Sequence, residues 1–193
     1  MSTLDEEDRR EYYRIEDTIA LEIRPLSIPE AAGQEVLQDA SPLFNLLSEL
    51  HLSEFESQHL LRQISERDRN IAAYLKVLNK RIDLLGQVVA LTVLGQIGEP
   101  QPVIISEGGI DFQHPTPIAT GAHLSIKLVL MPQALGLLLR ARVTHCDRKG
   151  DGYDVGTEFE HLTDAQRQLL ARYILQKQAQ ERRLAREQNE SGI

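Results

Sequence analysis

The sequence has no tryptophan, a single cysteine and few aromatic residues, which make up 5% of its 193 residues. The lone Cys146 excludes an internal disulfide and a cysteine-rich zinc site, and it fits a reducing compartment. No apolar run is long enough to cross a bilayer, and the acidic, hydrophilic first eleven residues do not resemble a signal peptide. We therefore expect a soluble cytoplasmic protein without a membrane span.

The chain also has no excess of positive charge, because its 29 acidic residues outnumber its 21 lysines and arginines and the formal net charge is −8. This balance disfavours nonspecific binding to DNA or to an anionic membrane, so a phosphate ligand would need a local cluster of basic side chains. The six histidines show no metal-ligand spacing, and no phosphate-binding loop or dinucleotide fingerprint is present. His145 and Cys146 could suggest a thiol nucleophile, but neighbours on a strand point to opposite faces. We expect no metal, no cofactor and no catalytic activity.

The most regular pattern in the chain is a heptad series of apolar residues between positions 61 and 89. Its spacings alternate between three and four, and its members are Leu61, Ile64, Asp68, Ile71, Leu75, Leu78, Ile82, Leu85 and Val89. Such a narrow stripe needs a partner helix, and its choice of leucine and isoleucine favours parallel tetramers over dimers. We predict a homotetrameric coiled coil in which Asp68 is a polar layer that sets the register. The alternative is an amphipathic helix that folds back on its own domain.

The surrounding sequence predicts an α+β protein. A capping box at Ser53 indicates that the heptad helix begins there and continues to about Leu94, after a shorter helix that begins at Ser41-Pro42. Short alternating strands joined by glycine and proline turns predict a small antiparallel β-barrel. We expect an arm and first strand (1–28), a helical insertion (41–95, coiled coil about 61–89), the rest of the barrel (96–162), and a C-terminal helix with a fraying polar tail (163–193).

Two short segments carry residue types that suit an anionic nucleotide. The first holds Arg9, Arg10 and Arg14 around two tyrosines, and arginine forks can hold phosphates or stack on bases. The second, Ser106 to Gly109, is a glycine-rich turn that lets backbone N–H groups approach a ligand. Taken singly, the first also fits a solvated charge run and the second an ordinary tight turn.

Together the two segments and the strand pattern resemble the PilZ domain, a bacterial receptor for cyclic di-GMP. The family's RxxxR element matches Arg10 to Arg14, with Arg9 preceding it. Its [D/N]xSxxG element matches at Ser106 and Gly109, but its first position is Ile104. A later pattern, glycine followed three residues on by phenylalanine and then a helix, matches Gly156 to Phe159.

The resemblance implies a cyclic di-GMP site formed by Arg9, Arg10, Arg14, Ser106, Gly108 and Gly109. In that interpretation the chain is an oligomeric signalling adaptor that acts through contact with an unknown protein partner. The alternative function is a degenerate PilZ-like adaptor that no longer binds the nucleotide, a reading favoured by Ile104. An apolar side chain at that position cannot make the hydrogen bond of the family's Asp or Asn.

Overall fold

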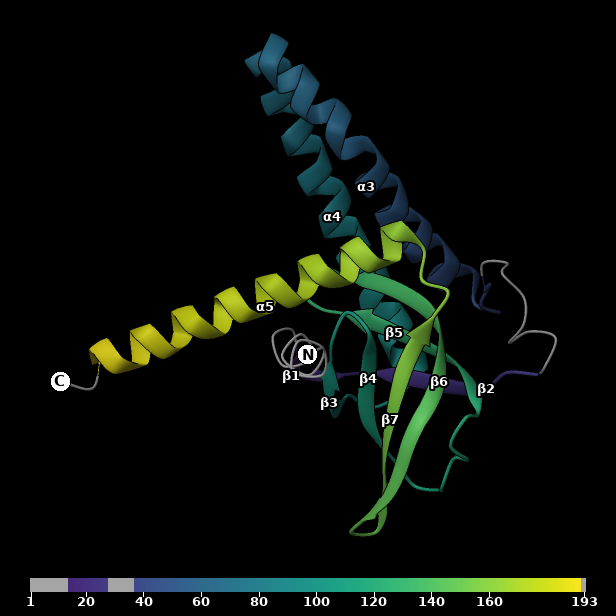
Figure 1. Ribbon diagram of the computed structural model, residues 1–193. Coiled ribbons are helices and arrows are strands. Elements are labelled where there is room, and N and C mark those ends of the chain that lie inside the picture. The colour runs from purple at the N-terminus through teal and green to yellow at the C-terminus, as the bar shows by residue number, and fades with distance from the viewer. Residues whose placement is uncertain (1–13, 28–36, 192–193) are drawn as a thin grey trace, which may run out of the picture. The chain divides into compact units, whose positions relative to one another are not determined.

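The computed structural model describes residues 14–27 and 37–191. Seven strands form one curled sheet in the order β1-β3-β4-β7-β6-β5-β2, and the paired registers of β2 with β5, β3 with β4 and β4 with β7 are antiparallel. The strands are β1 (Ile15–Ile19), β2 (Leu21–Pro25), β3 (Gln101–Ile105), β4 (Gly109–His114), β5 (His123–Leu130), β6 (Leu135–Lys149) and β7 (Gly152–Glu160). Figure 1 shows them together with three long helices. The predicted α+β class, with a barrel-like sheet, a helical insertion and a C-terminal helix, is confirmed.

The chain divides into two compact units. The first contains most of β1, all of β3, β4 and β7, the second part of β6, and α5 (Asp164–Ser191). The second contains β2, β5, the first part of β6, and the helices α3 (Pro42–Arg67) and α4 (Arg69–Ile97). Strand β6 is therefore shared between the two units.

The core of the first unit consists of the alternate inward side chains of its strands. Fully or almost fully buried are Val103, Ile105, Ile110, Phe112, Val143 and Val155. Helix α5, predicted over 163–193, begins with a capping box: the Thr163 N–H donates to Gln166 Oε1 at 3.0 Å, and the Gln166 N–H donates to Thr163 Oγ1 at 3.2 Å. Its first turns bury Leu169, Leu170, Tyr173 and Ile174.

The second half of α5 differs from the expected fraying tail, because the helix continues to Ser191. The residues of this half are strong helix formers, and charges four apart support one another, as in the ion pair of Arg183 with Glu187 at 3.3 Å. The apolar Leu184 in this half is exposed. Helix propensity, and not burial, therefore accounts for this half of the helix.

The second unit has its own apolar cluster, in which α3 and α4 pack with residues of the sheet. Its buried members are Ala20, Phe44, Leu47, Ala90, Val93, Ile97, Val129 and Ala134. Helix α3 begins as predicted, with Ser41 as its N-cap, Pro42 in its first turn, and the Ser41 hydroxyl accepting from the Phe44 N–H at 3.4 Å. Ser53, however, lies in the middle of α3, so the prediction of a second helix start there was wrong.

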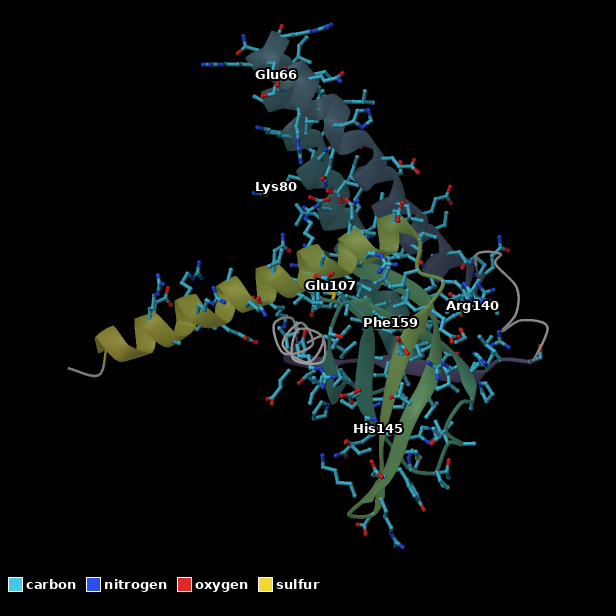
Figure 2. All side chains as sticks on the ribbon, viewed as in Figure 1. Glu66, Lys80, Glu107, Arg140, His145 and Phe159 are labelled. Atoms are coloured by element: carbon cyan, nitrogen blue, oxygen red, sulfur yellow. The ribbon has the colours of Figure 1, made fainter. Side chains whose placement is uncertain are left out.

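The prediction of one continuous heptad helix was also wrong, because the chain reverses at Asp68. This residue leaves the helical conformation at φ −143° and ψ 104° and ends α3 while capping α4. Its carboxylate accepts from the N–H groups of Asn70 and Ile71 at 2.9 and 3.0 Å. Aspartate is a strong N-cap and a weak interior residue, so it favours the break over a polar coiled-coil layer. The result is a helical hairpin (Figure 1), with Glu66 at its tip (Figure 2).

Within residues 14–27 and 37–191, no helix is long and apolar enough to cross a membrane. In the same part of the chain, no three side chains of the metal-binding types gather as a metal site would require.

Candidate functional site

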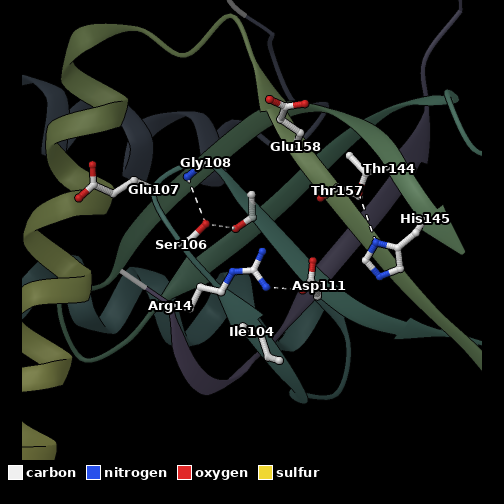
Figure 3. Close-up of a pocket in the computed structure, with 11 residues that line it drawn as sticks. Arg14, Ile104, Ser106, Glu107, Gly108, Asp111, Thr144, His145, Thr157 and Glu158 are labelled. Carbon is white, nitrogen blue, oxygen red and sulfur yellow. Dashed lines mark hydrogen bonds and ion pairs between the residues drawn. The ribbon is translucent and has the colours of Figure 1, made fainter. Parts of the chain in front are cut away.

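A pocket of about 510 Å³ lies in the first unit, over strands β3, β4, β7 and β6 (Figure 3). Small-molecule pockets commonly measure a few hundred to a thousand Å³. The lining residues are Arg14, Ile104, Ser106, Glu107, Gly108, Gly109, Asp111, Thr144, His145, Thr157 and Glu158. The pocket therefore collects residues from four separate segments of the chain.

One wall of the pocket is the tight turn between β3 and β4. The Ser106 N–H donates to the Gly109 carbonyl at 2.9 Å, and the Gly108 N–H donates to Ser106 Oγ at 3.2 Å. The Phe159 N–H of β7 donates to the Gly108 carbonyl at 2.8 Å. The serine hydroxyl thus holds the shape of its own turn, and strand β7 fixes that turn against the sheet.

The two glycines of this turn have different physical roles. A Cβ atom on Gly109 would lie 2.0 Å from the carbonyl oxygen of Thr157, so the close approach of β4 to β7 requires glycine there. A Cβ on Gly108 would meet nothing within 4 Å. Gly109 is therefore a requirement of the fold, whereas Gly108 leaves open space at the pocket.

A lateral row of four residues crosses the strands that form the pocket. Ile104 of β3 stands directly opposite Asp111 of β4, and Asp111 stands directly opposite Gly156 of β7. The imidazole of His145 on β6 lies over Gly156, because a Cβ there would come within 1.9 Å of the ring. The bare glycine thus makes room for His145 beside Asp111.

The charges around the pocket are mixed. Arg14 Nη1 lies 3.8 Å from Asp111 Oδ2, and Figure 3 shows the guanidinium pointing toward this carboxylate. Burial raises the pKa of Asp111 above its ordinary value, although the positive charge of Arg14 and the nearby His145 act in the opposite direction. Two further carboxylates, Glu107 and Glu158, line the pocket, and Glu158 is paired with Arg142 at 2.9 Å.

Comparison with known proteins identifies the family of this fold. The model of the PilZ domain matches residues 79–176, which is slightly more than half of the chain. The chain belongs to the PilZ domain family. The match runs from within α4 into α5 and includes the Ser106 turn and the Gly156 to Phe159 segment. No curated protein matches this PilZ sequence.

Two solved structures resemble this one. A pathogenic protein of Xanthomonas campestris, described as a tetrameric PilZ domain self-assembled through a helical bundle, shares 15% identity and a TM-score of 0.54, with 91% of each chain covered. The inhibitor of motility from Bacillus subtilis shares 20% identity over 43% of each chain, with a TM-score of 0.38. The Xanthomonas structure supports the PilZ fold over most of the chain, including its helices.

Four of the predicted ligand residues line the same pocket of this PilZ domain, namely Arg14, Ser106, Gly108 and Gly109. Arg9 and Arg10 lie outside the described residues. Cys146 and His145 have different surroundings, because the Ile118 N–H donates to Cys146 Sγ at 3.4 Å while His145 lines the pocket. The pattern that suggested a thiol nucleophile is therefore an ordinary strand segment.

Asp111 is one of the pocket residues that the sequence reasoning missed, together with Thr144, His145, Thr157 and Glu158. The sequence does indicate the position of Asp111, because a tight turn joining Ser106 to Gly109 places Ile105 opposite Ile110 and Ile104 opposite Asp111. Side chains directly opposite each other in an antiparallel pair lie on the same face. The hairpin register alone would have placed a carboxylate beside the position where Ile104 departs from the family motif.

The predicted assembly residues are divided by the hairpin. Leu61 and Ile64 lie on α3, and Asp68 forms the turn. On α4, Leu75 and Leu78 are half-buried, whereas Ile71, Ile82 and Leu85 are exposed. The predicted seam is therefore not a single surface, because part of it is covered within the protein.

A different series on α4 forms an exposed stripe that is apolar except at one position. Its members are Tyr74, Val77, Leu84, Val88 and Leu91, which are between 49% and 62% exposed. Arg81 fills the one gap, so the spacings alternate between three and four throughout. At 3.6 residues per turn, this stripe lies on the helix face opposite Ala72, Gly86 and Ala90, which are buried. We refer to these five side chains as the α4 stripe.

Proposed function

We propose that this PilZ domain is a cytoplasmic bacterial receptor that binds cyclic di-GMP in the Arg14–Ser106 pocket. It carries no catalytic role, and it passes the signal on through contact with a protein partner. The observation that supports this proposal is the convergence of Arg14, Ser106, Gly108 and Gly109 on a single pocket of about 510 Å³. These residues belong to two motifs that lie more than ninety positions apart in the sequence.

The charges of the pocket indicate where the phosphates of the ligand would bind. Among the described lining residues, Arg14 is the single arginine or lysine, and it shares the pocket with Glu107, Asp111 and Glu158. Carboxylates repel phosphates, so the phosphates would lie toward the arm, where Arg14 continues to Arg10 and Arg9. We propose that these three arginines neutralise the two phosphates.

Titration calorimetry with cyclic di-GMP tests the receptor function. We expect saturable binding by the wild-type protein and a loss of binding in Arg10→Ala and Arg14→Ala. Arg186→Ala removes an exposed arginine of α5 that does not line the pocket, so it should bind like wild type. A flat titration with wild-type protein at high concentration would exclude the receptor function.

The proposal also includes assembly into a homotetramer through the helical hairpin. The α4 stripe is regularly spaced and apolar apart from Arg81 in its single gap, as expected of a helix that packs against another helix. Since α3 covers the opposite face of α4, the stripe is available to a second copy of the chain. The tetrameric helical bundle described for the Xanthomonas relative supports a tetramer in preference to a dimer.

Light scattering tests the assembly. We expect a mass about four times the 21.8 kDa of one chain for the wild-type protein. Val77→Glu with Leu84→Glu places two charges in the stripe and should produce monomers, while circular dichroism remains unchanged. Lys76→Glu adds charge at an exposed position off the stripe and should leave the mass unchanged. A wild-type monomer would contradict the assembly.

The second candidate function is that of an adaptor that does not bind cyclic di-GMP. Ile104 and the three pocket carboxylates favour it, because they remove a hydrogen-bonding group and add repulsion toward phosphates. Calorimetry separates the two functions, since only the receptor should release or take up heat with cyclic di-GMP. Assembly through the α4 stripe is expected in both.

A further inference from the structure

We propose that Asp111 recognises a guanine base in this pocket, with Ile104 against the face of the base. This inference rests on the proposed binding of cyclic di-GMP and names a recognition residue outside the two sequence motifs. The Asp111 carboxylate accepts hydrogen bonds from N1–H and the N2 amino group of guanine. Ile104 supplies an apolar contact surface in place of a polar contact.

The register of the sheet supports this division of roles. Ile104 and Asp111 are direct partners across β3 and β4, so their side chains project from the same face, and both line the pocket. The Ile104 side chain is 39% exposed, which leaves apolar surface available to a ligand. A flat base resting on Ile104 would have its edge beside the neighbouring carboxylate.

The chemistry of guanine fits this carboxylate better than a phosphate does. The Watson–Crick edge of guanine presents two adjacent donors, and the two oxygens of a carboxylate can accept from both. A phosphate near Asp111 would also face Glu107 and Glu158 in the same pocket. The base, and not the phosphate, is therefore the part of the ligand that belongs at Asp111.

The partly buried state of Asp111 agrees with a role in binding. Its side chain is 22% exposed, and its ion pair with Arg14 is long at 3.8 Å, with the arginine 54% exposed. Ion pairs of this kind contribute little to stability. The carboxylate also accepts from the backbone of Thr157, but its two oxygens offer about four acceptor sites, so acceptor capacity is left for a ligand.

The competing explanation is that Asp111 only positions Arg14. The two roles make different predictions for ligands that differ in one donor. Cyclic di-IMP carries hypoxanthine in place of guanine and so lacks the N2 amino group. An acceptor for that group would discriminate between the two dinucleotides, whereas a residue that only positions an arginine would affect both equally.

Calorimetry with both dinucleotides tests the inference. Wild-type protein should bind cyclic di-GMP about tenfold or more tightly than cyclic di-IMP, since a good bidentate contact is worth about 1–3 kcal/mol. Asp111→Ala should weaken cyclic di-GMP binding by about ten- to a hundredfold and remove most of the preference. The isosteric Asp111→Asn, which preserves the shape of the side chain, should behave similarly because its amide presents a donor to the donors of guanine. Arg14→Ala should weaken both ligands equally, and Glu181→Ala on α5 should change neither.

The outcomes separate this inference from the proposed function. If the wild-type protein binds cyclic di-GMP but the Asp111 variants keep its preference over cyclic di-IMP, the inference is overturned while the receptor function holds. If the Asp111 variants weaken both ligands by the same factor, the residue positions Arg14 and the inference is again overturned. If the wild-type protein binds neither ligand, the receptor function itself is overturned and the inference fails with it.

Discussion

Tyr173 of α5 donates its phenolic hydrogen to the carboxylate of Asp17 on β1. Lys177, one turn further along α5, reaches the other oxygen of the same carboxylate at 2.7 Å. Asp17 lies three residues after Arg14, so the segment that brings Arg14 to the pocket is tied directly to the C-terminal helix.

Replacing Tyr173 tests the strength of this tie. Tyr173→Phe keeps the buried ring but removes the donor, so we expect a loss of about 1 kcal/mol in the free energy of unfolding. Tyr153→Phe is the matched control, because Tyr153 lies on β7, outside the α4 stripe, and its hydroxyl makes no hydrogen bond within the described residues. Urea unfolding followed by circular dichroism at one protein concentration measures both. Equal stability of wild type and Tyr173→Phe would show that Lys177 alone satisfies Asp17.

The same hydrogen bond predicts a pH dependence at alkaline pH. Burial, together with the Asp17 carboxylate, raises the pKa of Tyr173 above its ordinary value. The folded state therefore prefers the protonated phenol, and this stabilisation is fully present below about pH 10 and is lost as the pH rises toward the folded-state value. We expect the unfolding free energy of wild type to fall more steeply above about pH 10 than that of Tyr173→Phe. Parallel slopes in urea titrations would contradict the prediction.

Replacing Asp111 should raise the stability of the ligand-free protein although it weakens binding. Its pKa is raised by burial, so the folded state prefers the protonated acid, and that stabilisation is present below the ordinary value of 3.8 and lost as the pH rises. At neutral pH the neutral side chain of Asp111→Asn removes this cost, so we expect its ligand-free melting temperature to exceed that of wild type. Thermal unfolding at neutral and at acidic pH, with Glu66→Gln as a surface control, measures the difference. A lower melting temperature of Asp111→Asn at neutral pH would contradict the expected sign.

The two glycines of the Ser106 turn form a matched pair for substitution. Gly109→Ala would force a methyl group against the Thr157 carbonyl, and we expect it to lose about 1–3 kcal/mol of stability. Gly108→Ala meets open space and should leave the stability of the ligand-free protein unchanged. Urea unfolding of both variants measures the difference. Equal losses would show that the turn, and not the approach of β4 to β7, sets the requirement for glycine.

Replacing Asp68 should lower the free energy of unfolding, because this residue caps the turn between α3 and α4. Asp68→Ala removes an acceptor for two backbone N–H groups at the start of α4, and we expect a loss of about 1 kcal/mol. Asp83→Ala changes an exposed aspartate inside α4, where alanine is the better helix former, so it should cost nothing. Both are compared by urea unfolding at equal protein concentration. A gain in stability of Asp68→Ala would mean that a continuous helix is as favourable as the hairpin.

Local signals in the sequence were sufficient for the starts of α3 and α5, but not for that of α4. The Ser41-Pro42 pair and the Thr163-Gln166 capping box act within a few residues, so their outcomes did not depend on the rest of the fold. The turn at Asp68 was missed because a one-residue break leaves the apolar spacing in phase on both sides. The exposed stripe was missed for a related reason: burial of Leu75 and Leu78 depends on α3, which the pattern within α4 does not report.

The binding pocket was predictable in part. Arg14 and the Ser106 turn were found through motifs, because each is a short run of characteristic residue types. Asp111 and His145 come together only through pairing across β4, β7 and β6, with Gly156 making the space between them. Such nonlocal pairing is weakly encoded in any single segment of sequence, although the β3–β4 register was accessible from its turn.

The reversal of the chain at Asp68 also means that the length of the helical insertion can change. Because α3 and α4 run side by side in opposite directions (Figure 1), the chain enters the hairpin at Ser41 and leaves it at Gly98 from the same end. Matched turns could therefore be removed from both helices, or added to them, without changing where the chain meets the sheet. The length of this hairpin is therefore independent of the residues that line the pocket.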